Sequence, residues 1–160
     1  MVQAVDRRRL GRHLRHLTQL LLDGISALTH GTGAPVVRVH GPHDVVGRGA
    51  TIALSLHDSA GRVIPYWDVE AAARDEGIAI RGGCFCNPGC AEAAFHFPEA
   101  RVRSCLDTLG GEFTIPRFAA CLDDQTVGAI RVSMGLGTVR SDIERFLAFL
   151  GRYVQARAAA

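Results

Sequence analysis

The chain begins with a helical pattern of hydrophobic residues over residues 6–29. Its apolar side chains recur every three or four positions, as a helix with one buried face requires: Leu10, Leu14, Leu17, Leu21, Ile25 and Leu28. The stretch HGTGAP follows and ends the predicted helix. A second amphipathic pattern over residues 141–157 predicts a closing helix, with Ser141 as its cap and Glu144 as the capping-box partner.

Between these two helices the pattern changes to short apolar or alternating runs, which are typical of strands. Strands are predicted at 36–40, 50–58, 78–81 and 127–135, and shorter helices at 66–77, 100–110 and 115–122. The strands carry too many apolar residues for both faces of a sheet to be exposed. The order of elements therefore indicates one small sheet with helices packed on it, in a single domain over residues 1–160.

Composition and charge argue against two classes of partner, nucleic acids and membranes. The net charge of +2 is too small to indicate a nucleic-acid partner, and no run of about eighteen apolar residues predicts a membrane span. Five arginines gather near the start of the chain: Arg7, Arg8, Arg9, Arg12 and Arg15. Such a cluster is usually a solvated helix face, with a binding role as the alternative. We expect a protein without a nucleic-acid or membrane partner.

Cysteine and lysine usage adds two expectations. Five cysteines, an odd number, and no export signal indicate a reducing cytoplasm and free thiols. Cys105 and Cys121 lie in apolar helical patterns, which favours buried thiols acting as small hydrophobic groups. All eighteen basic residues are arginine, so no lysine side chain can form a Schiff base.

The remaining cysteines, Cys84, Cys86 and Cys90, lie in RGGCFCNPGC at residues 81–90, where glycine and proline predict an irregular loop. A zinc site is one interpretation, but the spacing C-x-C-x3-C lacks the usual paired units and has His96 as its nearest fourth ligand. A Cys84–Cys86 disulfide would close a strained ring. A purely structural loop stays open. A reactive thiol fits best, because Arg81 and a nearby helix start would both favour the thiolate.

This segment resembles a known family. IAIRGGCFCNPG (78–89) is similar to the cysteine segment of molybdenum cofactor sulfurases, in the class V aminotransferase superfamily of pyridoxal phosphate (PLP) enzymes that includes cysteine desulfurases. VGAIRVSMGLGTVRSDIERFLAFL (127–150) resembles their C-terminal strand, arginine and closing helix, and APVVRVHGP (34–42) the strand that opens their small domain. The resemblance implies an α+β fold: a small, mainly antiparallel sheet with helices on one face, including those at 6–29 and 141–157.

The resemblance also implies residue roles. The motif R-x-G-x-x-C is matched by Arg81, Gly83 and Cys86, and Cys86 would carry sulfur as a persulfide. Arg131 would clamp the substrate carboxylate, a task that suits a guanidinium, and Arg81 would assist it. Gly82 stands where the sulfurases usually have threonine. Cys84 belongs to the sulfurase version of the motif and receives no role. Cys90 receives none either, because the sulfurases place their third cysteine one residue later.

The family is about twice this length or more, and its larger domain carries the PLP lysine, which is absent here. We therefore expect a domain like the C-terminal small domain, which binds no PLP alone and is inactive without a PLP-binding partner domain. Whether the chain takes part in enzyme chemistry is left open. The alternative is a non-catalytic sulfur carrier or partner-docking module. The expected partner is a PLP-binding large domain or a second copy on an exposed face; the sulfur acceptor is unknown.

Overall fold

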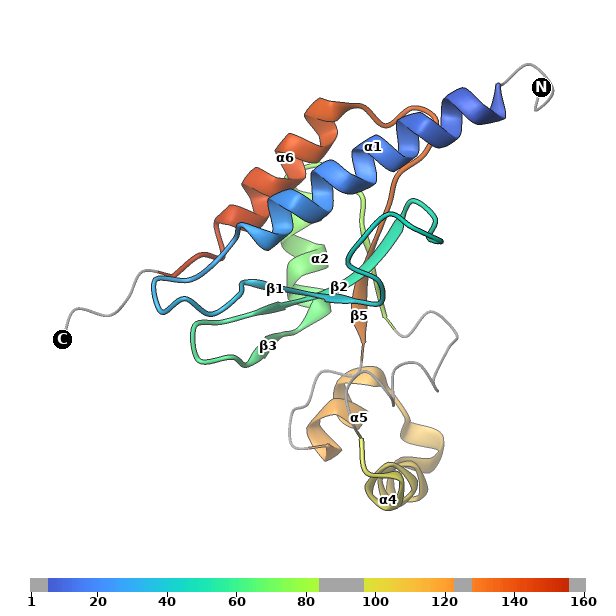
Figure 1. Cartoon of the computed structure of the whole chain (residues 1–160). Coiled ribbons are helices and arrows are strands. Elements are labelled where there is room, and N and C mark those ends of the chain that lie inside the picture. Colours follow the sequence, from blue (N-terminus) through green and yellow to red (C-terminus); the bar gives the residue numbers. More distant parts are fainter. Residues whose placement is uncertain (1–5, 84–96, 123–127, 156–160) are drawn as a thin grey trace.

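The computed structural model describes residues 6–83, 97–122 and 128–155 (Figure 1). Its elements in chain order are α1 (Arg7–Ser26), β1 (Val37–His40), β2 (Thr51–His57), β3 (Val63–Ile64), α2 (Tyr66–Asp75), β4 (Arg81–Gly83), α4 (Glu99–Leu109), the 3-10 turn η2 (Gly110–Glu112), α5 (Ile115–Cys121), β5 (Ala129–Ser133) and α6 (Arg140–Gly151).

The strands form one antiparallel sheet in the order β1-β2-β5-β4, with β3 pairing on β2. Leu54 in the middle of β2 pairs with Val39 of β1 on one side and Ile130 of β5 on the other. Side chains alternate between the two faces of a strand, so these three share a face. All three are buried, and they form the sheet layer of the core.

Helices α1, α2 and α6 cover this apolar face. In Figure 1, α1 and α6 lie side by side over the sheet. Leu21 of α1, Val69 of α2 and Phe149 of α6 all belong to the same buried cluster as the strand residues. The expected α+β fold, a small and mainly antiparallel sheet with helices on one face, is confirmed. We call these three helices with the five strands the sheet unit.

Helix boundaries follow local capping chemistry. Asp6 begins α1, because its carboxylate accepts hydrogen bonds from the backbone N–H groups of Arg8 and Arg9. The predicted Ser141 cap of the last helix is wrong. Helix α6 begins one residue earlier, at Arg140, and the Asp142 carboxylate accepts from the Val139 N–H at 2.9 Å. This helix also ends at Gly151, before the predicted limit of 157.

Strand β4 is shifted from the predicted 78–81 to Arg81–Gly83. The apolar run before it has another task, because Ile78 and Ile80 pack against the core of the sheet unit from outside the strand. Arg81 consequently opens the strand, and the cysteine segment follows directly after Gly83.

Residues between β4 and β5 include a separate helical part, α4, η2 and α5, which we call the helical hairpin. Its own small buried cluster is formed by Cys105, Ala119 and Leu122, with Trp67 of α2 packed against it. The expectation of free thiols is wrong for two cysteines: Cys105 and Cys121 form a disulfide, with Cα atoms 5.8 Å apart. Their apolar helical positions face each other across the hairpin, so the pattern that indicated burial also brings the two sulfur atoms together.

Candidate functional site

The face of the sheet opposite the helices brings the two predicted substrate arginines together. Arg81 of β4 pairs directly with Arg131 of β5 in the antiparallel ladder. Directly paired residues project to the same face, with Cβ atoms about 5 Å apart. Both arginines are exposed. Two like charges in direct register disfavour the pairing, so this arrangement suits an anion held between them.

The row continues across the sheet. Arg131 also pairs with Ala53 of β2, which pairs with His40 of β1. Arg38, two residues before His40, lies on the same face and is exposed. The described strands contain no aspartate or glutamate, so the strand residues bring only positive and neutral groups to this face. Its chemistry is that of an anion-binding surface.

A hydrogen-bonded series of side chains orders the β1–β2 side of this face. The His57 ring donates from Nδ1 to the Gly61 carbonyl at 3.1 Å, so in its neutral form Nε2 accepts from the Ser55 hydroxyl at 3.2 Å. The Ser55 Oγ is also 3.1 Å from His40 Nε2, from which it can accept. Burial, and secondarily the nearby charges of Arg38 and His57, lower the pKa of His40. The lowered pKa favours the neutral form of His40, which lies on the same face of the sheet as the arginine pair.

Tyr66 fixes the β4–β5 pair from the helix side. A Cβ added to Gly82 would meet Tyr66 Cδ2 at 2.0 Å, and one added to Gly128 would meet Tyr66 Cε1 at 2.8 Å. The ring therefore occupies the space above both glycines. This explains a glycine at 82, where the sulfurases usually have threonine, and it places Arg81 on the opposite face. The sequence did not reveal this contact, because the three residues are far apart along the chain.

The predicted persulfide cysteine, Cys86, lies outside the described residues, as do Cys84, Cys90 and His96. Within the parts of the chain that the structure describes, no cluster of three or more histidine, cysteine or acidic residues could hold a metal ion. The residues do not fit covalently bound PLP either, because the chain has no lysine for the Schiff base. The two arginines are the described part of the predicted site.

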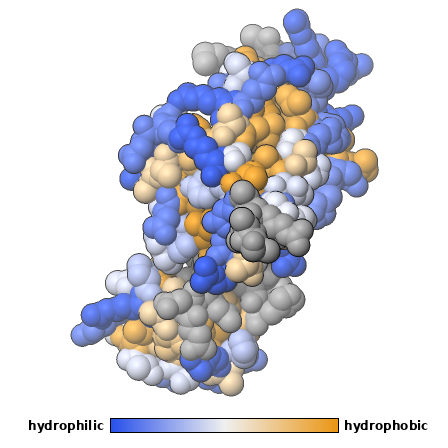
Figure 2. All heavy atoms as spheres, turned by 90° about the vertical axis from the view of Figure 1, so that its left-hand side faces the viewer, coloured by the Kyte–Doolittle hydropathy of each residue, from blue (hydrophilic) through white to orange (hydrophobic). Residues whose placement is uncertain are grey.

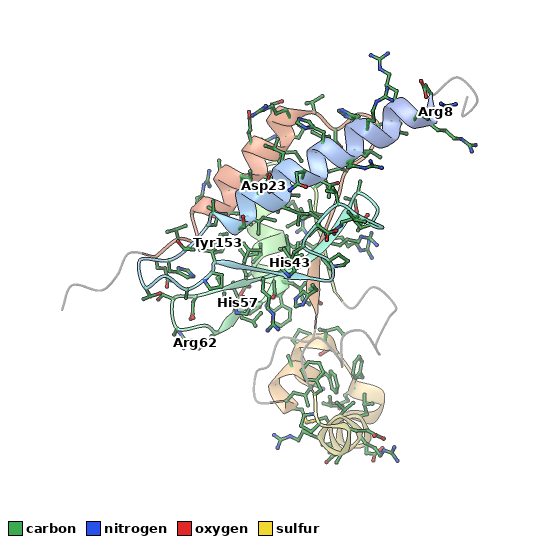
Figure 3. All side chains as sticks on the ribbon, in the orientation of Figure 1. Arg8, Asp23, His43, His57, Arg62 and Tyr153 are labelled. Carbon is green, nitrogen blue, oxygen red and sulfur yellow. A yellow bond between two sulfur atoms is a disulfide. The ribbon has the colours of Figure 1, made fainter. Side chains whose placement is uncertain are left out.

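A separate groove runs along the edge strand β1, with a volume of about 630 Å³. Asp23 of α1, His43 and His57 are among the residues that line it, and Figure 3 labels all three. The groove does not include Arg81 or Arg131. It is therefore distinct from the arginine pair, and sequence reasoning gave no signal for it.

Sequence comparison finds molybdenum cofactor sulfurases. The protein of that name from Drosophila yakuba is 30% identical over 145 residues, which cover 89% of this chain and 18% of the relative. The Bos taurus molybdenum cofactor sulfurase is 28% identical over 145 residues, covering 87% of this chain and 16% of the relative. The chain thus spans less than a fifth of these relatives. No family model matches it.

Structure comparison finds cysteine desulfurases. The apo enzyme from Thermococcus onnurineus NA1 matches with a TM-score of 0.56 and 17% identity, over 91% of this chain and 26% of that one. A cysteine desulfurase from Escherichia coli matches with a TM-score of 0.55 and 15% identity, over 95% and 27%. These likenesses show the fold. Sequence and fold together support the resemblance seen in the cysteine segment: the chain is similar to molybdenum cofactor sulfurases over 89% of its own length and shares the fold of part of the cysteine desulfurases.

Proposed function

We propose that this chain is the substrate-carboxylate and sulfur-carrying part of a sulfurase- or desulfurase-like system. Cys86 carries sulfur as a persulfide, and Arg131, assisted by Arg81, binds the carboxylate of the substrate. The observation that supports this most strongly is the direct pairing of Arg81 with Arg131 on the exposed sheet face, in the strand that leads into the cysteine segment. One guanidinium can hold a carboxylate by two parallel hydrogen bonds, and a second can donate to the remaining lone pairs of the carboxylate oxygens.

Release of sulfur from an amino-acid substrate then depends on a PLP-binding domain supplied by another chain or another part of a longer protein. That domain would cover the arginine face, or a second copy would in its absence. The chain alone should therefore form no internal PLP adduct that borohydride can fix, the N-terminal amine being the one group able to react. A stoichiometric internal adduct would contradict this part of the proposal.

A cytoplasmic location stays a prediction. None of the described helices has the length and hydrophobicity needed to span a membrane.

Two alkylating reagents test the cysteine and the arginines together. Iodoacetate carries a carboxylate and iodoacetamide does not, so their rate ratio at Cys86, relative to the ratio at free glutathione, measures local attraction for a carboxylate. We expect Cys86 to react before Cys84 and Cys90, with an apparent pKa below the free-thiol value of about 8.5. The relative rate with iodoacetate should be several-fold higher than with iodoacetamide.

Arg131→Gln should remove most of that preference, and Arg81→Gln a smaller part. The matched control is Arg62→Gln, an exposed arginine that pairs with Asp58 at 2.8 Å on the β2–β3 turn. An unreactive Cys86 would overturn the sulfur-carrying role. A reactive Cys86 whose iodoacetate preference survives Arg131→Gln would overturn the carboxylate clamp alone.

The second candidate function is a non-catalytic sulfur carrier or docking module without PLP chemistry. The charge of the open face favours it as an alternative, because an anionic partner surface would bind the same arginines. The two functions differ in what restores sulfur release from cysteine: a PLP-binding domain restores it in the first and leaves the chain inactive in the second.

A further inference from the structure

The N-terminal half of α1 carries positive charge that the sheet unit does not use. Arg8, Arg12 and Arg15 are spaced by four and three residues, so they share one face of the helix and span about 10 Å. All three are exposed, and Figure 3 shows Arg8 close to the end of α1 that lies farthest from the strands. The buried residues of this helix begin only at Leu17. We call Arg8, Arg12 and Arg15 the arginine stripe.

Electrostatic interactions within α1 disfavour the arginine stripe. Like charges three or four residues apart on a helix repel each other. Positive charge near a helix N-terminus also opposes the helix dipole, and apart from the Asp6 cap the first turn of α1 contains no acidic residue. No ion pair joins the stripe to a carboxylate of the residues that the structure describes. A feature that weakens its own helix calls for a functional explanation.

A second observation concerns the surface next to Arg15, the residue of the stripe nearest the buried part of α1. A hollow of about 200 Å³ separates α1 from the loop before β2, and Arg15 and Arg48 both line it. Arg48 donates from its terminal nitrogens to the carbonyls of Pro42 and Thr51, but its buried Nε has no hydrogen-bond partner among the described residues. An unsatisfied buried donor is costly, and more so on a charged group. A carboxylate in the hollow would lie between the like charges of Arg15 and Arg48 and offset their repulsion.

We propose that the arginine stripe and the Arg15–Arg48 hollow form a binding site for an acidic polypeptide segment, with one carboxylate seated in the hollow and others along the stripe. A helix with glutamates at positions i, i+4 and i+7 has the matching spacing. This site is separate from the Arg81–Arg131 pair and does not depend on the proposed sulfur chemistry.

Charge and hydrophobicity favour a polypeptide over other anions. Removing the five arginines of residues 7–15 from the total of 18 leaves 13 against 16 acidic residues in the rest of the chain. A long nucleic acid reaching past α1 would therefore meet net negative charge. A membrane-bound helix needs a free apolar face, but the apolar face of α1 packs against the strands and α6. A short acidic segment meets neither obstacle.

The test uses the full chain and a fluorescently labelled helical peptide with glutamates at i, i+4 and i+7, measured by anisotropy. The same peptide with glutamines, a DNA duplex and anionic phosphatidylserine vesicles are the comparisons. We expect the glutamate peptide to bind most tightly and to weaken with salt. Arg8→Gln, Arg12→Gln and Arg15→Gln combined should weaken binding by about tenfold, and Arg15→Gln alone should account for the largest single share.

The matched control replaces Arg103, Arg117 and Arg140, which pair with surface glutamates, and should change binding less than about twofold. The stripe variant should unfold at the same or a higher temperature, because it relieves like-charge repulsion. Equal loss in the control, equal binding of the glutamine peptide, tighter binding of the duplex or the vesicles, or a lower unfolding temperature of the stripe variant would each overturn the proposal.

Discussion

The sheet unit and the helical hairpin are stabilised in different ways. The sheet unit buries large apolar side chains from three helices and the strands in one continuous cluster, including Leu21, Leu54 and Phe149. The hairpin buries Cys105, Ala119 and Leu122, and leaves Leu106 and Phe113 exposed. Figure 2 shows hydrophobic surface on the lower part of the molecule as well as the upper.

The difference shows that a small buried cluster needs a source of stability other than hydrophobic packing. Hydrophobic stabilisation grows with the apolar area buried, and a short two-helix segment buries little. The Cys105–Cys121 disulfide joins α4 to α5 across 16 residues of sequence, which limits the freedom of the unfolded hairpin. The sheet unit therefore depends on packing, and the hairpin depends on a covalent link.

The largest effect is expected in the core of the sheet unit. Leu54→Ala removes a fully buried side chain from the central strand and should lower the free energy of unfolding by about 2–5 kcal/mol. Leu106→Ala is the control in the hairpin, where the side chain is 46% exposed, and should cost less than about 1 kcal/mol. Urea denaturation followed by circular dichroism measures both. Equal losses would contradict the proposed difference between the two regions.

Removal of the disulfide should act on the hairpin alone. Replacing Cys105 and Cys121 together by alanine should destabilise it by about 3 kcal/mol, the value expected for a closed loop of this length. Hydrogen exchange should then accelerate in α4 and α5 but not in β2 or α6. Trp67, the one tryptophan of the chain, packs against the hairpin cluster, and its fluorescence should change in parallel. Faster exchange across the whole sheet unit would show that the two regions unfold together.

A steric change at the β4–β5 pair should have an intermediate effect. Gly82→Thr places a Cβ into the Tyr66 ring and should cost about 1–3 kcal/mol by overpacking. Adding Tyr66→Ala opens that space, so the double variant should lose less than the two single losses combined. Gly111→Ala in the hairpin is the control, because no atom lies within 4 Å of the added Cβ. Additive losses at Gly82 and Tyr66 would argue against the contact.

The smallest effect concerns pH. Because the pKa of His40 is lowered in the folded state, mainly by burial, the unfolded chain binds more protons just below pH 6.5. The contribution of His40 to stability is therefore present above about pH 6.5 and is lost as the pH falls toward the lowered pKa. His40→Gln should flatten this part of the pH–stability curve. A histidine NMR titration that places His40 above its ordinary pKa would contradict the sign.

The elements most accessible from sequence were those with strong periodicity. The helical repeat of Leu14, Leu17 and Leu21 predicted α1 nearly to its ends, and the alternating run at 50–58 predicted β2. The boundaries of elements without such a repeat were predicted less exactly. Strand β4 was predicted at residues 78–81, but it spans Arg81–Gly83, and Ile78 and Ile80 pack on the core from outside the strand. A three-residue strand carries too little pattern to locate its register.

The candidate site likewise has features that the sequence predicted and features that only the structure revealed. Local sequence predicted which residues carry chemistry, since Arg81, Arg131 and the cysteine segment stand in motifs that resemble those of a known family. Only the tertiary structure decided that Arg81 lies directly across from Arg131, that Tyr66 fills the space above Gly82 and Gly128, and that Cys105 meets Cys121. The physical reason is that strand register and helix packing depend on contacts between distant segments, which periodicity along the chain does not encode.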